Sequence, residues 1–134
     1  MNKTRLTIIR DWILTHPDKF NMGSFFGDKD MSPLPPKTAR EIENSCGTTC
    51  CIAGYAVARF YTAPAPPPES IKEIARGLLR LDCRQAEWLF FGDFAREFLF
   101  DISPHHAAAA IDHLLFGGET HNEDGDPTQI LIRS

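Results

Sequence analysis

Three of the four cysteines in this chain lie within six residues of one another, at Cys46, Cys50 and Cys51. The run that follows, through Tyr61, is predicted to be a helix with Thr48 or Thr49 as its N-cap, because a hydroxyl can accept a hydrogen bond from a first-turn amide. A thiol at a helix N-terminus lies at the positive end of the helix dipole, which lowers its pKa. The cluster could therefore supply an activated nucleophile.

A nucleophilic cysteine also needs a base, and a predicted helix over residues 103–116 carries three histidines, at positions 105, 106 and 113. A Cys-dependent enzyme would use Cys51 or Cys46 with a histidine of that helix such as His106. The competing interpretation is that these cysteines are small buried hydrophobic residues at a tight turn, as free cysteines often are. The pattern favours packing, so we assign no catalytic residue and keep the enzyme as the alternative.

Metal ligation is not predicted either. Cys46 and Cys50 are separated by three residues rather than two, and no second cysteine pair follows, unlike a closed zinc site. His106 and His113 share a helix face but lie about 10 Å apart along its axis, too far for one ion. The acidic turn at 122–126 is too short for a calcium loop. We expect no metal site and no cofactor.

The elements that must position these residues are helical. Apolar side chains recur with the helical period in four further segments, at 4–15, 69–81, 85–91 and 103–116. A short helical turn is expected at 38–44. Pro17 ends the first helix, Asp82 and Gln85 form a capping box, and Ser103 followed by Pro104 starts the last helix. Small residues after Cys51, Gly54 among them, predict a central helix that its neighbours approach closely.

The sequence therefore predicts an all-α fold, a compact bundle of about five helices with a Phe-rich core and an irregular Pro-rich connector. The most aromatic stretch runs from Trp88 to Phe100 and should form the heart of that core. Its large apolar residues are numerous enough to supply a partner-binding surface as well. Trp88, Phe94 and Phe98 are accordingly candidate contact residues.

Charge divides the chain into two parts. The formal net charge is −4, of which residues 1–118 contribute −1 and residues 119–134 contribute −3. We therefore expect a single helical domain over 1–118 and an acidic, turn-rich tail over 119–134. The tail carboxylates that could contact a basic partner are Glu119, Glu123, Asp124 and Asp126. No basic stripe is present to neutralise phosphates, so direct nucleic-acid binding is disfavoured.

Hydropathy and cysteine placement indicate a cytoplasmic protein. No stretch approaches the roughly 20 apolar residues of a membrane span, and the N-terminus lacks the pattern of a secretory signal. Clustered cysteines do not form the spread framework of an extracellular disulfide protein. A disulfide from Cys46 to Cys50 or Cys51 would close a very small loop, so it would be strained and reducible.

The chain resembles an uncharacterised family of small bacterial and phage proteins through the segment Cys46-Gly47-Thr48-Thr49-Cys50-Cys51-Ile52-Ala53-Gly54-Tyr55-Ala56. The family motif is Cys-Gly-Thr-x-x-Cys-Ile-Ala-Gly, followed by an aromatic residue or His and then Ala. The run 75–90 is similar to a second family element, a Leu-rich helix, a polar cap and a short helix ending in Leu-Phe. The resemblance implies that Cys46 and Cys51 are the family positions and that Cys50 is an extra thiol. It implies no activity, and its phage members imply an accessory or anti-defence role.

The sequence as a whole predicts a small, non-catalytic protein-interaction module with a protein partner. The resemblance narrows this to a phage or mobile-element inhibitor of a host defence system. The Cys-dependent enzyme built on Cys51 or Cys46 is the alternative function. The oligomeric state does not follow from the sequence.

Overall fold

The computed structural model describes residues 1–23, 25–27, 37–44, 48–62, 66–95, 101–118 and 120. The described part contains six α-helices: α1 Lys3–Thr15, α2 Ala39–Asn44, α3 Ile52–Phe60, α4 Ile71–Leu79, α5 Cys83–Phe90 and α6 Pro104–Leu115. The all-α prediction is confirmed. The helix count exceeds the expected five because the predicted turn at 38–44 forms a helix, α2.

Three smaller elements accompany the helices. Two 3-10 turns lie at Pro17–Lys19 and Pro68–Ser70. Strands β1 (Phe26–Gly27) and β2 (Thr49–Cys50) pair antiparallel, with Phe26 opposite Cys50 and Gly27 opposite Thr49. No helix in the described part of the chain combines the length and the hydrophobicity that crossing a membrane requires.

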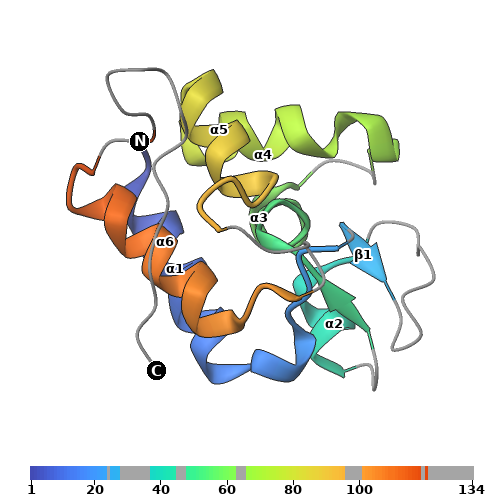
Figure 1. The fold of residues 1–134 in the computed structure, drawn as a ribbon. Helices are drawn as coiled ribbons and strands as arrows, with labels where there is room; N and C mark the ends of the chain where they lie inside the picture. Colours follow the sequence, from blue (N-terminus) through green and yellow to red (C-terminus); the bar gives the residue numbers. More distant parts are fainter. Residues whose placement is uncertain are drawn as a thin grey trace.

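The helices are arranged around α3 (Figure 1). Helices α1 and α6 lie side by side and run in opposite directions, and an ion pair of 2.7 Å between Arg10 and Asp112 joins them. Helix α4 packs against α3, and α5 packs in turn against α4. Helix α2 and the small sheet lie on the side of α3 away from α4 and α5. Each of the other helices therefore packs against α3 or against a helix that contacts α3.

The helix ends follow the local signals in the sequence. Helix α1 stops at Thr15, two residues before Pro17. At the start of α5, the Asp82 carboxylate accepts from the Gln85 amide at 2.7 Å, and the Gln85 side chain accepts from the Asp82 amide at 3.0 Å. Ser103 caps α6 by accepting from the His106 amide at 3.1 Å. These three boundaries were predicted, and the structure confirms them.

The start of α3 corrects one prediction. Neither Thr48 nor Thr49 is the N-cap, because Thr49 belongs to the extended strand β2, which pairs with β1. Cys51 takes the N-cap position, and its Sγ accepts a hydrogen bond from the Gly54 amide at 3.4 Å. The strand pairing extends the backbone up to Cys50, so the helix begins only at Ile52.

The described core is mainly aliphatic, with a few aromatic side chains at its centre. Its largest fully buried side chains are Trp88, Phe94, Leu6, Ile9, Ile13, Ile42, Ile52, Ile71, Leu79, Leu89, Ile111 and Leu114. Trp88 packs edge-on against Phe94, with ring centroids 5.6 Å apart, and 5.3 Å from the ring of His113. Phe98 and Phe100 lie outside the described residues, and so do Glu119 and residues 121–134. The Phe-rich core and the tail boundary therefore stay predictions.

Gly54 allows the close approach at the centre of the fold. A Cβ atom built at this position would collide with the carbonyl oxygen of Phe25 and would lie 2.9 Å from the carbonyl carbon. Ala53, Gly54 and Ala56 are all buried, as the run of small residues predicted. Helix α3 therefore packs directly onto the backbone that leads into β1.

Two glycine substitutions test this packing. Gly54→Ala should lower the free energy of unfolding by about 1–3 kcal/mol, because the methyl group has no space. Gly77→Ala in α4 is the matched control, since nothing lies within 4 Å of its Cβ position. That change should raise the free energy of unfolding by about 0.5–1 kcal/mol, because alanine favours a helix interior. Urea unfolding would measure both values, and equal effects at the two positions would contradict the packing described.

Candidate functional site

Two of the three clustered cysteines that the sequence singled out are buried and do not lie in an open cleft. Cys50 lies on β2 with no exposed surface, and Cys51, at the start of α3, is 3% exposed. Cys83, the first residue of α5, is exposed. All three are free thiols. Cys46 lies outside the described residues.

Burial opposes the alternative in which Cys51 is an activated nucleophile. Loss of solvent raises the pKa of the Cys51 thiol from an ordinary value of 9.0 to about 11, although hydrogen bonds from the Gly54 and Ala53 amides act to lower it. Burial also raises the pKa of Cys50 well above 9.0, and the neighbouring Cys51 adds to the rise. Desolvation outweighs the effect of the helix N-terminus at Cys51, which favours the packing interpretation over the alternative of an activated thiolate.

Two of the three histidines of α6, His106 and His113, line the aromatic core, whereas His105 is exposed. His106 is only 8% exposed and meets the ring of Phe94 edge-on at 5.5 Å. His113 contacts Trp88 in the same region. Within the described residues, no group of three or more His, Cys, Asp or Glu side chains could hold a metal ion. His106 accordingly contributes to the packing of the core.

The predicted contact residues also need correction. Trp88 and Phe94 have no exposed surface. They were offered both as core and as contacts for a partner, and they lie in the core, where Trp88 packs on Phe94 and Phe94 packs on His106 of α6. The other candidates, Phe98, Glu119, Glu123, Asp124 and Asp126, lie outside the described residues.

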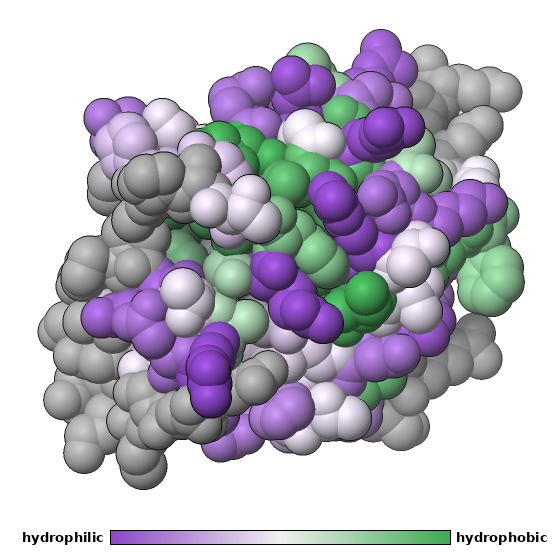
Figure 2. Space-filling model, turned by 180° about the vertical axis from the view of Figure 1, so that it is seen from behind, coloured by the Kyte–Doolittle hydropathy of each residue, from purple (hydrophilic) through white to green (hydrophobic). Residues whose placement is uncertain are grey.

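Some apolar side chains do reach the surface. Phe116 is 87% exposed and Phe91 is 46% exposed. Figure 2 shows a face on which apolar residues gather in a central patch that polar side chains border and interrupt. Exposed apolar residues are common on folded proteins, so this surface does not by itself define a site.

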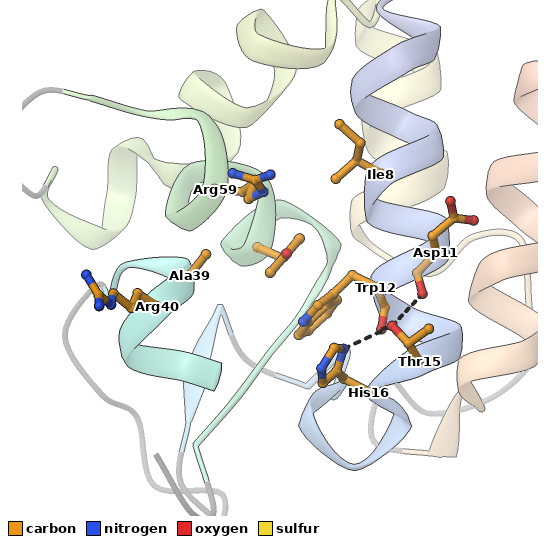
Figure 3. A pocket seen from close by; sticks show the side chains of 9 residues that line it. Ile8, Asp11, Trp12, Thr15, His16, Ala39, Arg40 and Arg59 are labelled. Carbon is orange, nitrogen blue, oxygen red and sulfur yellow. Dashed lines mark hydrogen bonds between the residues drawn. The ribbon is translucent and has the colours of Figure 1, made fainter. Parts of the chain in front are cut away.

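The structure instead reveals a hollow that the sequence did not predict. It has a volume of about 470 Å³ and lies between α1, α2 and α3 (Figure 3). Nine residues line it: Ile8, Asp11, Trp12, Thr15, His16, Ala39, Arg40, Tyr55 and Arg59. We call it the α1–α3 hollow.

Stacked rings form a rigid base for the α1–α3 hollow. Trp12 lies parallel to Tyr55, with ring centroids 3.9 Å apart and planes inclined by 10°. His16 stacks on the same indole at 6.3 Å and 22°, and its Nδ1 lies 3.0 Å from the Thr15 hydroxyl. Rings held in this way are already ordered before a ligand arrives, so binding costs little side-chain entropy.

One polar atom at this base is unsatisfied. The indole Nε1–H of Trp12 is buried and has no hydrogen-bond partner. Figure 3 shows this edge of the ring turned toward the α2 side of the hollow. An unpaired buried donor costs about 1–3 kcal/mol. The fold therefore carries a destabilising donor beside the hollow.

The charges around the hollow leave an excess of cations. Asp11 is paired with Arg10 at 3.0 Å, and Arg10 also binds Asp112. Arg40 of α2 and Arg59 of α3 are exposed, and neither forms an ion pair in the part of the chain that the structure describes. The Arg59 guanidinium lies 5.9 Å from the ring of Phe60. The arrangement can therefore bind an acidic group.

The α1–α3 hollow brings together residues from three separated parts of the chain. Trp12 belongs to the helix predicted over 4–15 and is 4% exposed. Nothing in the local sequence around Arg40 or Arg59 distinguishes these two arginines from other surface residues. Only the packing of α2 beside α3 places them at one opening.

Comparisons with family models, with curated proteins and with solved structures find no match for this chain. The resemblance through residues 46–56 therefore stays a prediction. The function has to be inferred from the chemistry of the α1–α3 hollow and of the buried thiols.

The raised pKa of Cys51 predicts a loss of stability at high pH. The thiol ionises near pH 9.0 when unfolded and near pH 11 when folded. Its contribution to the free energy of unfolding is fully present below pH 9 and is lost as the pH rises toward 11. The loss should be about 2–3 kcal/mol. Urea unfolding between these pH values would measure it.

Two variants isolate the part of this loss that depends on Cys51. Cys51→Ala should show a shallower fall in the free energy of unfolding than the unmodified chain. Cys83→Ala, which changes an exposed cysteine, should keep the full fall. An equally steep fall in Cys51→Ala would mean that the Cys51 thiol ionises as easily in the folded state as in the unfolded state.

Proposed function

We propose that this protein is a small, non-catalytic interaction module that binds another protein through the α1–α3 hollow. The observation that carries the proposal is the pair of exposed guanidiniums, Arg40 and Arg59, beside the stacked rings of Trp12 and Tyr55. Arginine and aromatic side chains are enriched where proteins bind one another, and they dominate the binding energy there.

The chemistry of the hollow supports binding rather than catalysis. Its side chains include a hydroxyl, an imidazole and a carboxylate, on Thr15, His16 and Asp11. The Thr15 hydroxyl donates to the backbone carbonyl of Asp11 at 2.8 Å. The same hydroxyl lies 3.2 Å from the carbonyl of Trp12 and 3.0 Å from Nδ1 of His16, so its proton has two backbone acceptors besides the imidazole, and the geometry singles out no histidine-activated nucleophile. The raised pKa of the buried thiols disfavours the Cys-dependent alternative at Cys51.

The location of the protein and the identity of its partner are supported by different observations. A cytoplasmic location is favoured by the free thiols at Cys50, Cys51 and Cys83, since reducing compartments keep thiols unpaired. A partner in a host defence system is favoured only by the resemblance to phage proteins. The capture experiment described next identifies the partner and thereby tests this assignment.

Capture of partners from a lysate of the source organism tests the interaction. The full chain would be compared with Arg40→Glu/Arg59→Glu, which reverses both charges at the hollow. Lys3→Glu/Arg84→Glu is the matched control, since it makes the same change in net charge at two exposed residues outside the hollow lining. We expect a protein that the control retains and the hollow variant loses, with direct binding reproduced between purified components.

A third variant tests the acidic tail as the contact surface. Glu119→Gln/Glu123→Gln/Asp124→Asn/Asp126→Asn removes the tail carboxylates from the full chain. Loss of the partner in this variant alone would place the interface at the tail and not at the hollow. If neither the hollow variant nor the tail variant loses a partner that the control retains, the proposed function is rejected.

A further inference from the structure

We infer that the α1–α3 hollow recognises an acidic peptide segment, with carboxylates of the partner against Arg40 and Arg59. This inference rests on the proposed function and specifies the chemistry of the partner. It depends on three features: the placement of the charges, the capping of α2 and the unpaired indole donor.

The two arginines form one side of the hollow. In Figure 3, Arg40 and Arg59 lie on the side formed by α2 and α3, across from Asp11 on α1. The Asp11 carboxylate is already paired with Arg10, so it does not neutralise the guanidiniums opposite. A guanidinium binds a carboxylate through two parallel hydrogen bonds. Two guanidiniums from different helices therefore fit two separate carboxylates on an extended partner.

The backbone at the hollow does not form a phosphate cradle. Phosphate sites use free amides at a helix N-terminus or in a nest. At the start of α2, the Glu41 amide donates to the Thr38 hydroxyl at 3.2 Å, and the Thr38 amide donates to the Glu41 carboxylate at 3.2 Å. The chain thus caps α2 itself and places a negative charge there. Compact dianions are disfavoured, and the donors left for an anion are side chains.

The remaining lining fits a peptide better than a free anion. Ile8 and Ala39 offer apolar contact next to the arginines. The Trp12 Nε1–H lacks an acceptor, and a peptide backbone brings carbonyl oxygens at every residue. A segment with acidic residues on both sides of an apolar one would satisfy the guanidiniums, the apolar lining and the unpaired donor together.

Nitrogen-15 NMR of the full chain tests this directly, because the protein has two tryptophans. The indole N–H signal of Trp12 reports on the hollow, and that of Trp88, fully buried, serves as the internal control. The probe is the peptide acetyl-Glu-Glu-Phe-Glu-Glu-amide, and its matched control has Gln in place of every Glu. We expect saturable shifts of the Trp12 signal with a Kd of about 1 mM or tighter, and an unchanged Trp88 signal.

The variant Arg40→Gln/Arg59→Gln should weaken binding of the acidic probe by about tenfold or more. An unchanged Trp88 signal in this variant would show that the fold is intact. Inorganic phosphate is the second probe, and it should not shift the Trp12 signal at the concentration that saturates the peptide. A shift by phosphate alone would make the hollow a small-anion site and overturn the inference.

Two further outcomes would overturn the inference of an acidic peptide and leave the proposed function unaffected. One is an equal response to the Glu and Gln peptides, and the other is no response of Trp12 to the acidic peptide. In either case, a partner lost on charge reversal of Arg40 and Arg59 would still support binding at the hollow. If capture does not depend on these arginines, the proposed function itself fails.

Discussion

The contact between Gly54 and the backbone of Phe25 is the constraint on which the rest of this structure depends. Because Gly54 has no side chain, α3 reaches the chain that enters β1. That approach allows β1 to pair with β2 immediately before the helix, which extends Cys50 and leaves Cys51 as the N-cap. One residue after Gly54, Tyr55 then stacks on Trp12 of α1. The same packing thus buries the thiols and builds the base of the α1–α3 hollow.

The two buried thiols and the two arginines of the hollow differ in their exposure to solvent. The thiols of Cys50 and Cys51 are sealed, and desolvation raises their pKa despite the helix N-terminus beside them. The guanidiniums of Arg40 and Arg59 stay in contact with water and unpaired with carboxylates among the described residues. A buried ionisable group favours its neutral form, whereas an exposed cation remains charged and can exchange water for a ligand. These differences support the proposed electrostatic recognition at the hollow and oppose thiol reactivity at Cys50 and Cys51.

Binding at the hollow would use order that the fold has already established. The stack of His16, Trp12 and Tyr55 is held by packing and by the Thr15 hydroxyl. The arginines are the adjustable part, since long side chains on neighbouring helices can follow the position of a carboxylate. A rigid aromatic base with mobile cations at its rim suits an extended acidic segment, and the unpaired Trp12 donor adds one specific position for an acceptor.

Local sequence signals predicted the boundaries of α1, α5 and α6, because Pro17, the Asp82–Gln85 capping box and Ser103 act on amides within three or four residues. The helical period likewise predicted a helix over 4–15, and its apolar residues Leu6, Ile9, Trp12 and Ile13 are buried. The start of α3 was predicted wrongly, and the choices between core and contact surface for Trp88 and between packing and catalysis for Cys51 were left open, because each depends on segments distant in sequence. The α1–α3 hollow likewise depends on segments that are distant in sequence. Strand pairing, desolvation and the meeting of Trp12, Arg40 and Arg59 exist only once α1, α2 and α3 have packed together.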